Sequence, residues 1–382
     1  MLRNRRFLFV TFDAGGNVPP TLALVRRLVR RGHEVRVVGN SALAARITDS
    51  GGIFRAFVRA RDFGPPAPGL TAEDQIAEML AFMCSLELAQ DVIAEAETVD
   101  VLVIDCMLAA ALLSAERIEA PTAALVHFSY QRWVENADFV ERISAAMLPL
   151  LNQTGAGLGL RPMGIDIPVT ARLTDRATLA LAATLEQFDC PLAAPHPNLR
   201  YVGPILDEES PSWEPPGRPL VLVSFSSTYM RQEDALRRTL EAVGTLDTHA
   251  VCTLGNALGR EKVHAPANVL IEDWLPHGAV LPHAAAVVTH AGHSTIMAAL
   301  AHGVPMVCMP MGRDQHFNAE RVAALGAGRA ISSDASSAEI REALRAVLTN
   351  PSYRNVARRM AATITDLGRG ERAVMELEAL LG

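Results

Sequence analysis

The sequence predicts an α/β fold made of two doubly wound, Rossmann-like domains, and three observations carry this prediction. Apolar strands alternate with amphipathic helices at the spacing typical of parallel sheets that have helices on both faces. The alternation stops at a turn-rich stretch that begins near residue 204, and it starts again after residue 218. The chain has 382 residues, 49% of them hydrophobic, which is enough to bury a separate core in each of two domains.

The N-terminal half shows the first set of alternating elements. We predict strands over 7–11, 34–39, 101–104 and 122–126, a helix over 20–31, a helix that ends near residue 117 and a helix that starts near residue 71. Pro20 suits a first helical turn, where its missing N–H is not needed, and Gly32 is a natural helix stop. Residues 128–175 have weak periodicity, which is typical of loops that line a variable site.

The C-terminal half repeats the pattern after a linker rich in proline and turn residues. We predict strands over 220–225, 250–254, 269–271, 286–289 and 306–309, and helices over 233–243 and from Ser294 to Gly303. The expected organisation is an N-terminal domain over 1–203, a linker over 204–218 and a C-terminal domain over 219–382.

Composition excludes several classes of protein. The net charge of −7 gives no basic surface for nucleic acid, and no apolar run approaches the ~20 residues that cross a bilayer. The five cysteines, at 84, 106, 190, 252 and 308, form no CxxC pair, so neither a disulfide framework nor a zinc site is expected. We expect a cytoplasmic protein without stable membrane insertion, either a monomer or a homodimer.

The most informative residues lie between Trp274 and Gln315. The turn after the strand over 286–289 contains Gly292 and leads into a helix, whose positive end favours a diphosphate. His290 and Thr295 add side-chain donors there, Trp274 offers a flat face for a nucleobase, and Asp314 with Gln315 can bind sugar hydroxyls. Each feature alone has an ordinary reading as core, helix cap or solvated loop, but their combination is far more specific.

With these motifs, the sequence resembles the GT-B glycosyltransferases that use nucleotide sugars, especially the actinomycete enzymes that decorate natural products. The resemblance implies two Rossmann-like domains that face each other across a cleft, with the nucleotide sugar on the C-terminal domain. It assigns the donor to a set of residues at the matching motif positions. These are Trp274 and Leu275 for the base, His290, Gly292, His293, Ser294 and Thr295 for the diphosphate, Asp314 and Gln315 for the sugar, and Ser226 and Ser227 near the phosphates.

One departure from the family pattern concerns the nucleotide. Relatives that prefer UDP-sugars often have a glutamate three residues after the Ser/Thr of the turn, where it binds ribose hydroxyls. This chain has Ala298 there. Because deoxyribose lacks the 2′-hydroxyl, the loss of this acceptor matters little for thymidine. The departure therefore favours a dTDP-sugar over a UDP-sugar.

A second departure concerns the catalytic base. Relatives carry a histidine in a Gly-His-x-x-Pro turn after the first strand, oriented by an aspartate at the end of a later strand. The aspartate is present here as Asp105, but the histidine position is Asn17, and an amide cannot take a proton near neutral pH. Four explanations stay open: Asp105 acts directly, His127 acts as the base, the acceptor needs no strong base, or the protein binds without catalysis.

The acceptor side is expected to be aromatic and apolar. Its candidates are Phe128, Tyr130 and Trp133 in the loop region, with Met79, Phe82 and Met83 on the helix that starts near residue 71. Ordinary core packing at helical spacing is an equally good explanation of the two methionines.

The resulting functional hypothesis is an inverting hexosyltransferase that moves a sugar, a deoxyhexose, from a dTDP-sugar to a hydrophobic natural-product acceptor. No metal and no other cofactor is expected. The alternatives are a UDP-sugar transferase, a nucleotide-sugar epimerase and a catalytically silent nucleotide-sugar-binding partner. A Rossmann oxidoreductase is excluded, because the first strand is not followed by GxGxxG and the second ends in Gly39 and continues into Asn40, with no acidic residue there.

Overall fold

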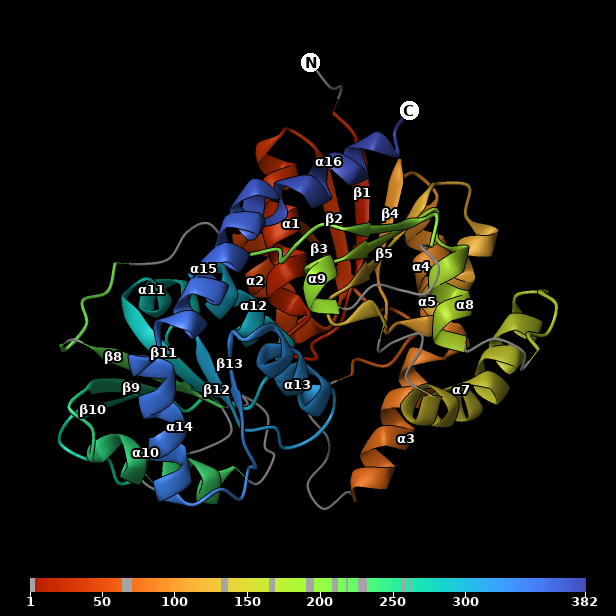
Figure 1. The fold of residues 1–382 in the computed structure, drawn as a ribbon. Helices are drawn as coiled ribbons and strands as arrows, with labels where there is room; N and C mark the ends of the chain where they lie inside the picture. Colours follow the sequence, from red (N-terminus) through yellow and green to blue (C-terminus); the bar gives the residue numbers. More distant parts are fainter. Residues whose placement is uncertain are drawn as a thin grey trace. The chain divides into compact units, whose positions relative to one another are not determined.

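The structure is a computed structural model, and it describes residues 4–63, 71–131, 137–164, 169–189, 196–207, 212–217, 219–225, 232–255, 259–260 and 263–382. The chain divides into two compact units, which are described separately. Unit 1 consists of Met1–Ile205 with Gly370–Gly382, and unit 2 consists of Leu206–Arg369. Both are parallel α/β sheets, as the sequence predicts (Figure 1).

Unit 1 is built on a seven-stranded parallel sheet in the order β3-β2-β1-β4-β5-β6-β7. Its strands are β1 (Arg6–Val10), β2 (Glu34–Gly39), β3 (Ile53–Ala56), β4 (Val101–Asp105), β5 (Thr122–Val126), β6 (Leu179–Ala182) and β7 (Leu199–Tyr201). Its helices are α1 (Val18–Arg30), α2 (Ala44–Asp49), α3 (Ala72–Met83), α4 (Leu86–Ala96), α5 (Ala109–Ser114), α7 (Ala137–Gly157), α8 (Val169–Arg176), α9 (Glu186–Asp189) and α16 (Glu371–Ala379).

The side chains of β1 point alternately to the two faces of this sheet, and each face is covered by its own apolar cluster. Phe7 and Phe9 point into one cluster, which they share with α1 and α16, while Leu8 and Val10 point into the opposite cluster under α3, α4 and α5. Successive strand side chains must point to opposite faces, so a strand that is buried on both sides is apolar throughout. The uninterrupted apolar run from Phe7 to Val10 follows from this requirement.

Unit 2 is built on a six-stranded parallel sheet in the order β10-β9-β8-β11-β12-β13. Its strands are β8 (Leu220–Ser224), β9 (His249–Thr253), β10 (Val269–Glu272), β11 (Ala284–Thr289), β12 (Met306–Cys308) and β13 (Gly328–Ala330). Its helices are α10 (Glu233–Gly244), α11 (His277–Val280), α12 (His293–Ala301), α13 (Gln315–Leu325), α14 (Ser337–Thr349) and α15 (Pro351–Asp366). Helices α10 and α14 share one apolar cluster with this sheet, and α12 packs against α15.

The end of the chain differs from the expected organisation. Residues 370–382 belong to unit 1, although the expected C-terminal domain extends to residue 382. Ala373, Val374 and Leu377 of α16 are fully buried in the core cluster that contains Phe7 and Phe9. The physical reason is an apolar stripe on α16 that packs against α1 and the sheet of unit 1.

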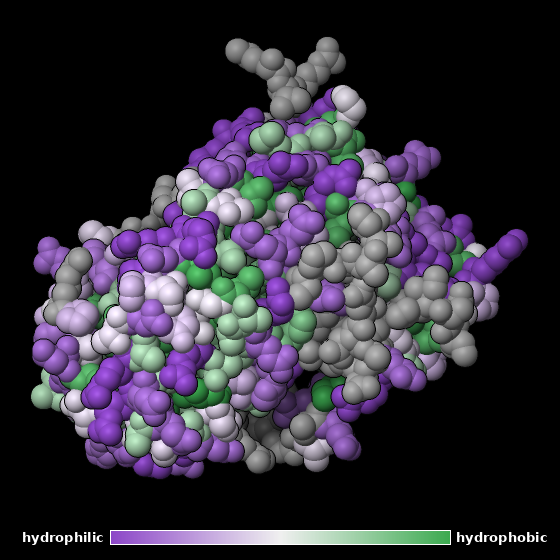
Figure 2. Space-filling model, in the orientation of Figure 1, coloured by the Kyte–Doolittle hydropathy of each residue, from purple (hydrophilic) through white to green (hydrophobic). Residues whose placement is uncertain are grey.

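Figure 2 shows a surface that is hydrophilic over most of its visible area, with hydrophobic residues in small separate groups. Among the residues that the structure describes, no helix is both long and apolar enough to cross a membrane. Cys84, Cys106, Cys252 and Cys308 are buried free thiols, and Cys190 lies outside the described residues.

Candidate functional site

The strand order places one polar cluster at the point in unit 1 where the sheet reverses its direction of winding. This point lies between β1 and β4, and ligands of open α/β sheets bind outside the carboxyl ends of the strands there. Asp105 is the last residue of β4, and Asn17 comes directly before α1. Their side chains meet, with Asn17 Nδ2 donating to Asp105 Oδ2 at 2.7 Å.

The Asn17 side chain is fully engaged within this cluster. Its Nδ2 also donates to the Phe12 carbonyl at 2.8 Å, and its Oδ1 accepts the Ala14 N–H at 3.2 Å. Asn17 is 1% exposed. Because both amide atoms bind fixed backbone groups, the orientation of the amide is set. Asn17 therefore holds the Asp105 carboxylate in one position.

His127 joins the cluster from the next strand. It follows β5, which pairs with β4 so that Leu125 lies opposite Asp105. Asp105 Oδ1 lies 3.2 Å from His127 Nε2 and accepts the Met107 N–H at 2.9 Å. The structure therefore brings together the three catalytic candidates that the sequence predicts.

Asp105 and His127 also form, with Cys106, a group whose potential metal-ligand atoms lie within 4.8 Å of one another. Burial, followed by the charge of Asp105, raises the pKa of the Cys106 thiol well above its usual range. Both Asp105 oxygens already accept hydrogen bonds, from Asn17 Nδ2 and from the Met107 N–H. We assign no metal to this group.

The predicted acceptor residues have unequal exposure. Phe128 and Met79 are half-buried, and the Phe128 ring lies edge-on to His127 with ring centres 4.8 Å apart. Phe82, Met83 and Tyr130 are 2% exposed and belong to the core, which is the alternative that the sequence left open for Met83. Their side chains pack inside the unit, so they can support an acceptor site but offer no surface to it. Trp133 lies outside the described residues.

An aromatic cluster beside this site was missed by sequence reasoning. Phe63, in the loop after β3, stacks on Phe82 with ring centres 5.0 Å apart, and Phe12 lies 6.1 Å from both rings. Asn40 Nδ2 donates to the Phe63 carbonyl at 2.6 Å and to Asp62 at 3.1 Å, which ties the loop to the sheet edge. Phe63 is half-buried, so it adds to the apolar surface at this edge.

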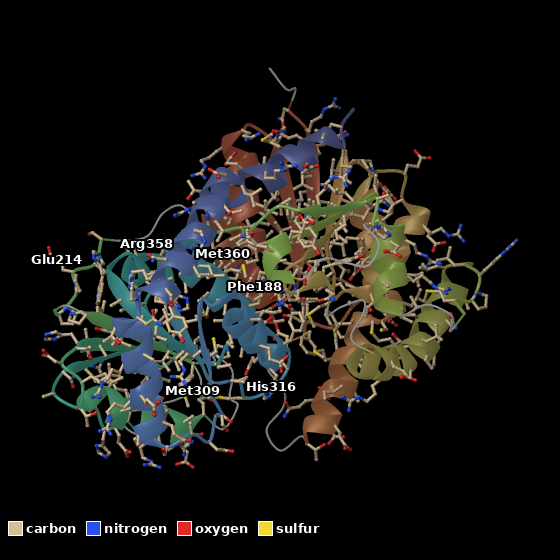
Figure 3. The ribbon with its side chains drawn as sticks, in the orientation of Figure 1. Phe188, Glu214, Met309, His316, Arg358 and Met360 are labelled. Carbon is tan, nitrogen blue, oxygen red and sulfur yellow. The ribbon has the colours of Figure 1, made fainter. Side chains whose placement is uncertain are left out.

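A second missed residue is Asp189, whose buried carboxylate holds the segment after His127. It follows Phe188 at the end of α9, and Phe188 is labelled in Figure 3. Asp189 accepts the Ser129 hydroxyl, the Tyr130 N–H at 2.9 Å and the Tyr201 hydroxyl at 2.9 Å. Burial raises the pKa of Asp189. Its neighbours in the sequence gave no signal, because every partner is at least 12 residues away.

Unit 2 has its own reversal point, between β8 and β11, and His290 follows β11 there. Ala291 has a φ of 67°, and Gly292 leaves room for the His290 ring, because a Cβ on Gly292 would lie 2.6 Å from His290 Nε2. Burial lowers the pKa of His290 to about 4, so the imidazole is neutral at pH 7. Its Nδ1 is buried without a hydrogen-bond partner among the described residues.

Helix α12 begins directly after this turn. Gly292 is its N-cap residue, and no side chain caps the helix. Ser294 is exposed in the first turn, whereas His293 and Thr295 are 7% and 8% exposed. An uncapped helix start next to a buried imidazole nitrogen fits an anionic ligand, since first-turn N–H groups need an acceptor.

The loop after β12 is organised by Asp314, Gln315 and Asn318. Gln315 is 2% exposed, and its Oε1 accepts the N–H groups of Met311 and Gly312 at 2.8 and 3.1 Å. Asn318 Nδ2 donates to Asp314 Oδ2 at 2.8 Å and to the Ala291 carbonyl at 3.1 Å. Asn318, which was not singled out from the sequence, therefore links the predicted sugar-binding residue to the turn that carries His290.

The predicted base-binding residues lie after β10. Trp274 is 71% exposed and Leu275 is half-buried. Nearby, His277 Nε2 lies 3.1 Å from Ser224 Oγ, which accepts the Thr253 hydroxyl at 3.0 Å. Burial also lowers the pKa of His277 to about 4. Ser226 and Ser227 lie outside the described residues.

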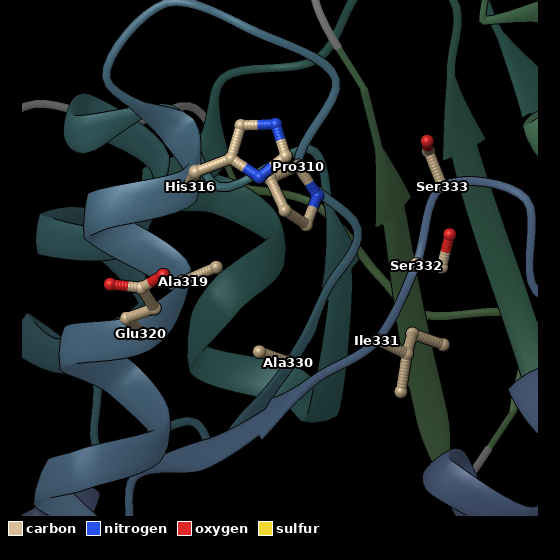
Figure 4. A pocket seen from close by; sticks show the side chains of 8 residues that line it. All are labelled: Pro310, His316, Ala319, Glu320, Ala330, Ile331, Ser332 and Ser333. Atoms are coloured by element: carbon tan, nitrogen blue, oxygen red, sulfur yellow. The ribbon is translucent and has the colours of Figure 1, made fainter.

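A hollow of about 290 Å³ lies beside α13, near the carboxyl ends of β12 and β13. Figure 4 shows the His316 ring beside Pro310, with the Ser332 and Ser333 hydroxyls on the opposite side. None of the residues that line this hollow belongs to the predicted site.

Comparison with known proteins agrees with this fold. Residues 237–380 match the family model of the C-terminal domain of erythromycin biosynthesis protein CIII-like proteins. The chain is 29% identical to 4′-demethylrebeccamycin synthase of Lentzea aerocolonigenes, covering 93% of this chain and 94% of that enzyme. It is 25% identical to the calicheamicin glycosyltransferase CalG4, with a TM-score of 0.83, and the match covers 100% of this chain and 99% of CalG4. The glycosyltransferase VinC, solved in complex with dTDP, is 23% identical, with a TM-score of 0.71, and the match covers 96% of this chain and 100% of VinC.

The two parallel sheets match the GT-B fold, and the similarity to named glycosyltransferases indicates an enzyme of the Leloir type, which uses a nucleotide sugar. Within that class, the chain resembles the actinomycete enzymes of natural-product biosynthesis.

Proposed function

We propose that this protein transfers a deoxyhexose from a dTDP-sugar to a hydrophobic natural-product acceptor, with inversion at the anomeric carbon. The observation that carries the proposal is the turn between β11 and α12. There, the buried unpartnered Nδ1 of His290 lies next to an uncapped helix start. A diphosphate supplies the acceptors that both features lack.

The proposed donor site consists of residues of unit 2. The face of Trp274 stacks on the base, and Asp314 accepts hydrogen bonds from hydroxyls of the sugar. Gln315 stabilises the loop that carries Asp314, because its Oε1 already accepts two backbone N–H groups. His290 stabilises the leaving diphosphate by donating a hydrogen bond from its buried ring.

The preference for thymidine rests on Ala298. This residue of α12 is 9% exposed and carries no group that could accept hydrogen bonds from ribose hydroxyls. The presence of dTDP in the VinC complex supports the same preference. Calorimetric titration of the full chain with dTDP and UDP tests it, and tighter binding of UDP would refute it.

The acceptor is proposed to bind at the carboxyl edge of the sheet in unit 1. Phe128, Met79 and Phe63 supply half-buried apolar surface next to the cluster of Asp105 and His127. Such surface suits a flat, hydrophobic aglycone. The four buried free thiols further support a reducing, cytoplasmic location, because oxidising compartments favour disulfides.

The deciding experiment incubates the full chain with a dTDP-deoxyhexose and a panel of hydrophobic aglycones. Mass spectrometry detects a glycosylated product, and NMR of the product gives the anomeric configuration. An isomerised nucleotide sugar would indicate an epimerase, and binding without turnover would indicate a silent partner. Either result would replace the proposed function.

A further inference from the structure

We propose that His127 is the general base of this enzyme, taking the acceptor proton on Nδ1 while Asp105 holds Nε2 and Asn17 holds Asp105. The inference rests on the proposed function, and it selects one of the four explanations that the sequence left open. It moves the base from the turn after β1 to the end of β5.

The hydrogen-bond pattern around Asp105 sets the tautomer of His127. Asn17 Nδ2 and the Met107 N–H are both pure donors, so the two oxygens of Asp105 act as acceptors. His127 Nε2 lies 3.2 Å from Oδ1 of this carboxylate and must therefore carry a proton. In a neutral imidazole, the lone pair is then on Nδ1.

The Nδ1 atom is available for this role. It has no hydrogen-bond partner among the described residues, and the side chain is 10% exposed. Asp105 and the Cys106 thiol are titratable groups that lie close to the ring. A base needs an available lone pair, and Nδ1 of His127 carries one when Nε2 is the protonated nitrogen.

A second histidine in unit 1, His33, also pairs its Nε2 with a carboxylate, but its Nδ1 is already occupied by a hydrogen bond. His33 Nε2 binds Glu378 Oε1 at 3.0 Å, but its Nδ1 accepts the Arg5 N–H at 3.3 Å, and the side chain is 1% exposed. His33 precedes β2, so it lies at the opposite edge of the sheet from His127. The two histidines share a tautomer and differ in whether Nδ1 is open.

Neither partner of His127 can take its place. Asp105 is 1% exposed at its side chain, and both of its oxygens already accept hydrogen bonds. Asn17 has no basic atom, and its amide binds backbone groups on both sides. Asp105 is thus a positioning residue that also stabilises the imidazolium, and Asn17 positions Asp105.

The proposed step balances as a single displacement. The acceptor O–H bond breaks, its proton passes to His127 Nδ1, and the oxygen electron pair forms the bond to the anomeric carbon. The bond from that carbon to the diphosphate breaks, and its electron pair leaves with the diphosphate. The imidazolium then returns its proton to water.

The test compares His127→Gln with the matched control His33→Gln in the full chain. Glutamine can still donate to Asp105 but cannot accept the proton, so kcat should fall about 10²- to 10⁴-fold. The KM for the donor should stay within about twofold, and the arm of the pH profile that reports the base should disappear. His33→Gln should keep both kcat and the pH profile.

Two further measurements separate chemistry from structure. An acidic phenol should lose less activity in His127→Gln than an aliphatic alcohol does, because it needs less help to deprotonate. Free imidazole should restore turnover to His127→Ala, which covers the case in which the glutamine variant fails to fold. Asp105→Asn should lower kcat while keeping a pH-dependent arm, since His127 is still present.

An unchanged kcat and pH profile in His127→Gln would overturn the proposal, and so would an equal loss for phenol and alcohol acceptors without imidazole rescue. Failure of the proposed function itself looks different. In that case, the unmodified chain binds dTDP but gives no product with any acceptor.

Discussion

The buried carboxylate of Asp189 allows a quantitative test of how the segment after β5 is held in place. In Asp189→Ala, the Ser129 hydroxyl, the Tyr201 hydroxyl and the N–H groups of Tyr130 and Gln131 lose this acceptor. Hydrogen bonds to charged groups contribute about 1.5–3 kcal/mol each, and rotating hydroxyls can find replacements more easily than backbone groups can. The burial that raises the pKa of Asp189 offsets part of the loss. We therefore expect the free energy of unfolding of unit 1 to fall by about 3–5 kcal/mol.

Asp189→Asn should be milder, at about 1–2 kcal/mol, because one oxygen remains to accept a backbone N–H. The assay is urea unfolding followed by hydrogen exchange and mass spectrometry, which resolves peptides of unit 1 when the two units unfold separately. Asp175→Ala is the control, since its side chain is 37% exposed and its pair with His196 should contribute about 1 kcal/mol or less. Equal losses in Asp189→Ala, Asp189→Asn and Asp175→Ala would refute the reasoning.

Three predictions concern unit 2. Burial lowers the pKa of His277 and His290 to about 4, below the ~6.5 of an unfolded chain, so the stability of unit 2 is greatest above pH 6.5. The free energy of unfolding should decline between pH 6.5 and pH 4, by up to about 3 kcal/mol for each histidine. In His290→Asn, the free energy of unfolding from urea titrations should depend less on pH across that range. Gly292→Ala should push the His290 ring aside and weaken dTDP binding in calorimetry without unfolding the unit, because the φ of −63° suits alanine. Trp274→Ala should change stability by less than ~0.5 kcal/mol, since the side chain is 71% exposed, yet weaken dTDP binding about tenfold. A stability loss in Trp274→Ala comparable to that of a core variant would contradict its assignment to the base.

Local sequence signals predict the donor turn well. The strand before His290 and the helix after Gly292 lie within two residues of their expected bounds, since apolar runs and a glycine turn encode them directly. The strand over 34–39 and the strand over 122–126 match in full.

Contacts between distant segments could not be predicted in this way. Asp189 lies 59 residues from its Tyr130 partner, and no pattern near it signals the pairing. The contact of Asp105 with His127 could be predicted in part, because Asp105 ends β4 and His127 follows the adjacent parallel strand β5, and the carboxyl ends of the two strands must lie together. Burial also divides residues that periodicity treats alike, such as the core residue Met83 and the half-buried Met79.

The return of α16 to unit 1 has a consequence for protein engineering. Arg31 binds Glu371 and Glu378, both at 2.5 Å, and Leu377 completes the core beneath α1. A fragment that stops at residue 205 would thus lack part of its own interior. Chimeric transferases that exchange acceptor halves between relatives should therefore carry two crossovers, one near residue 205 and one near residue 370, so that each donor sequence brings its own closing helix.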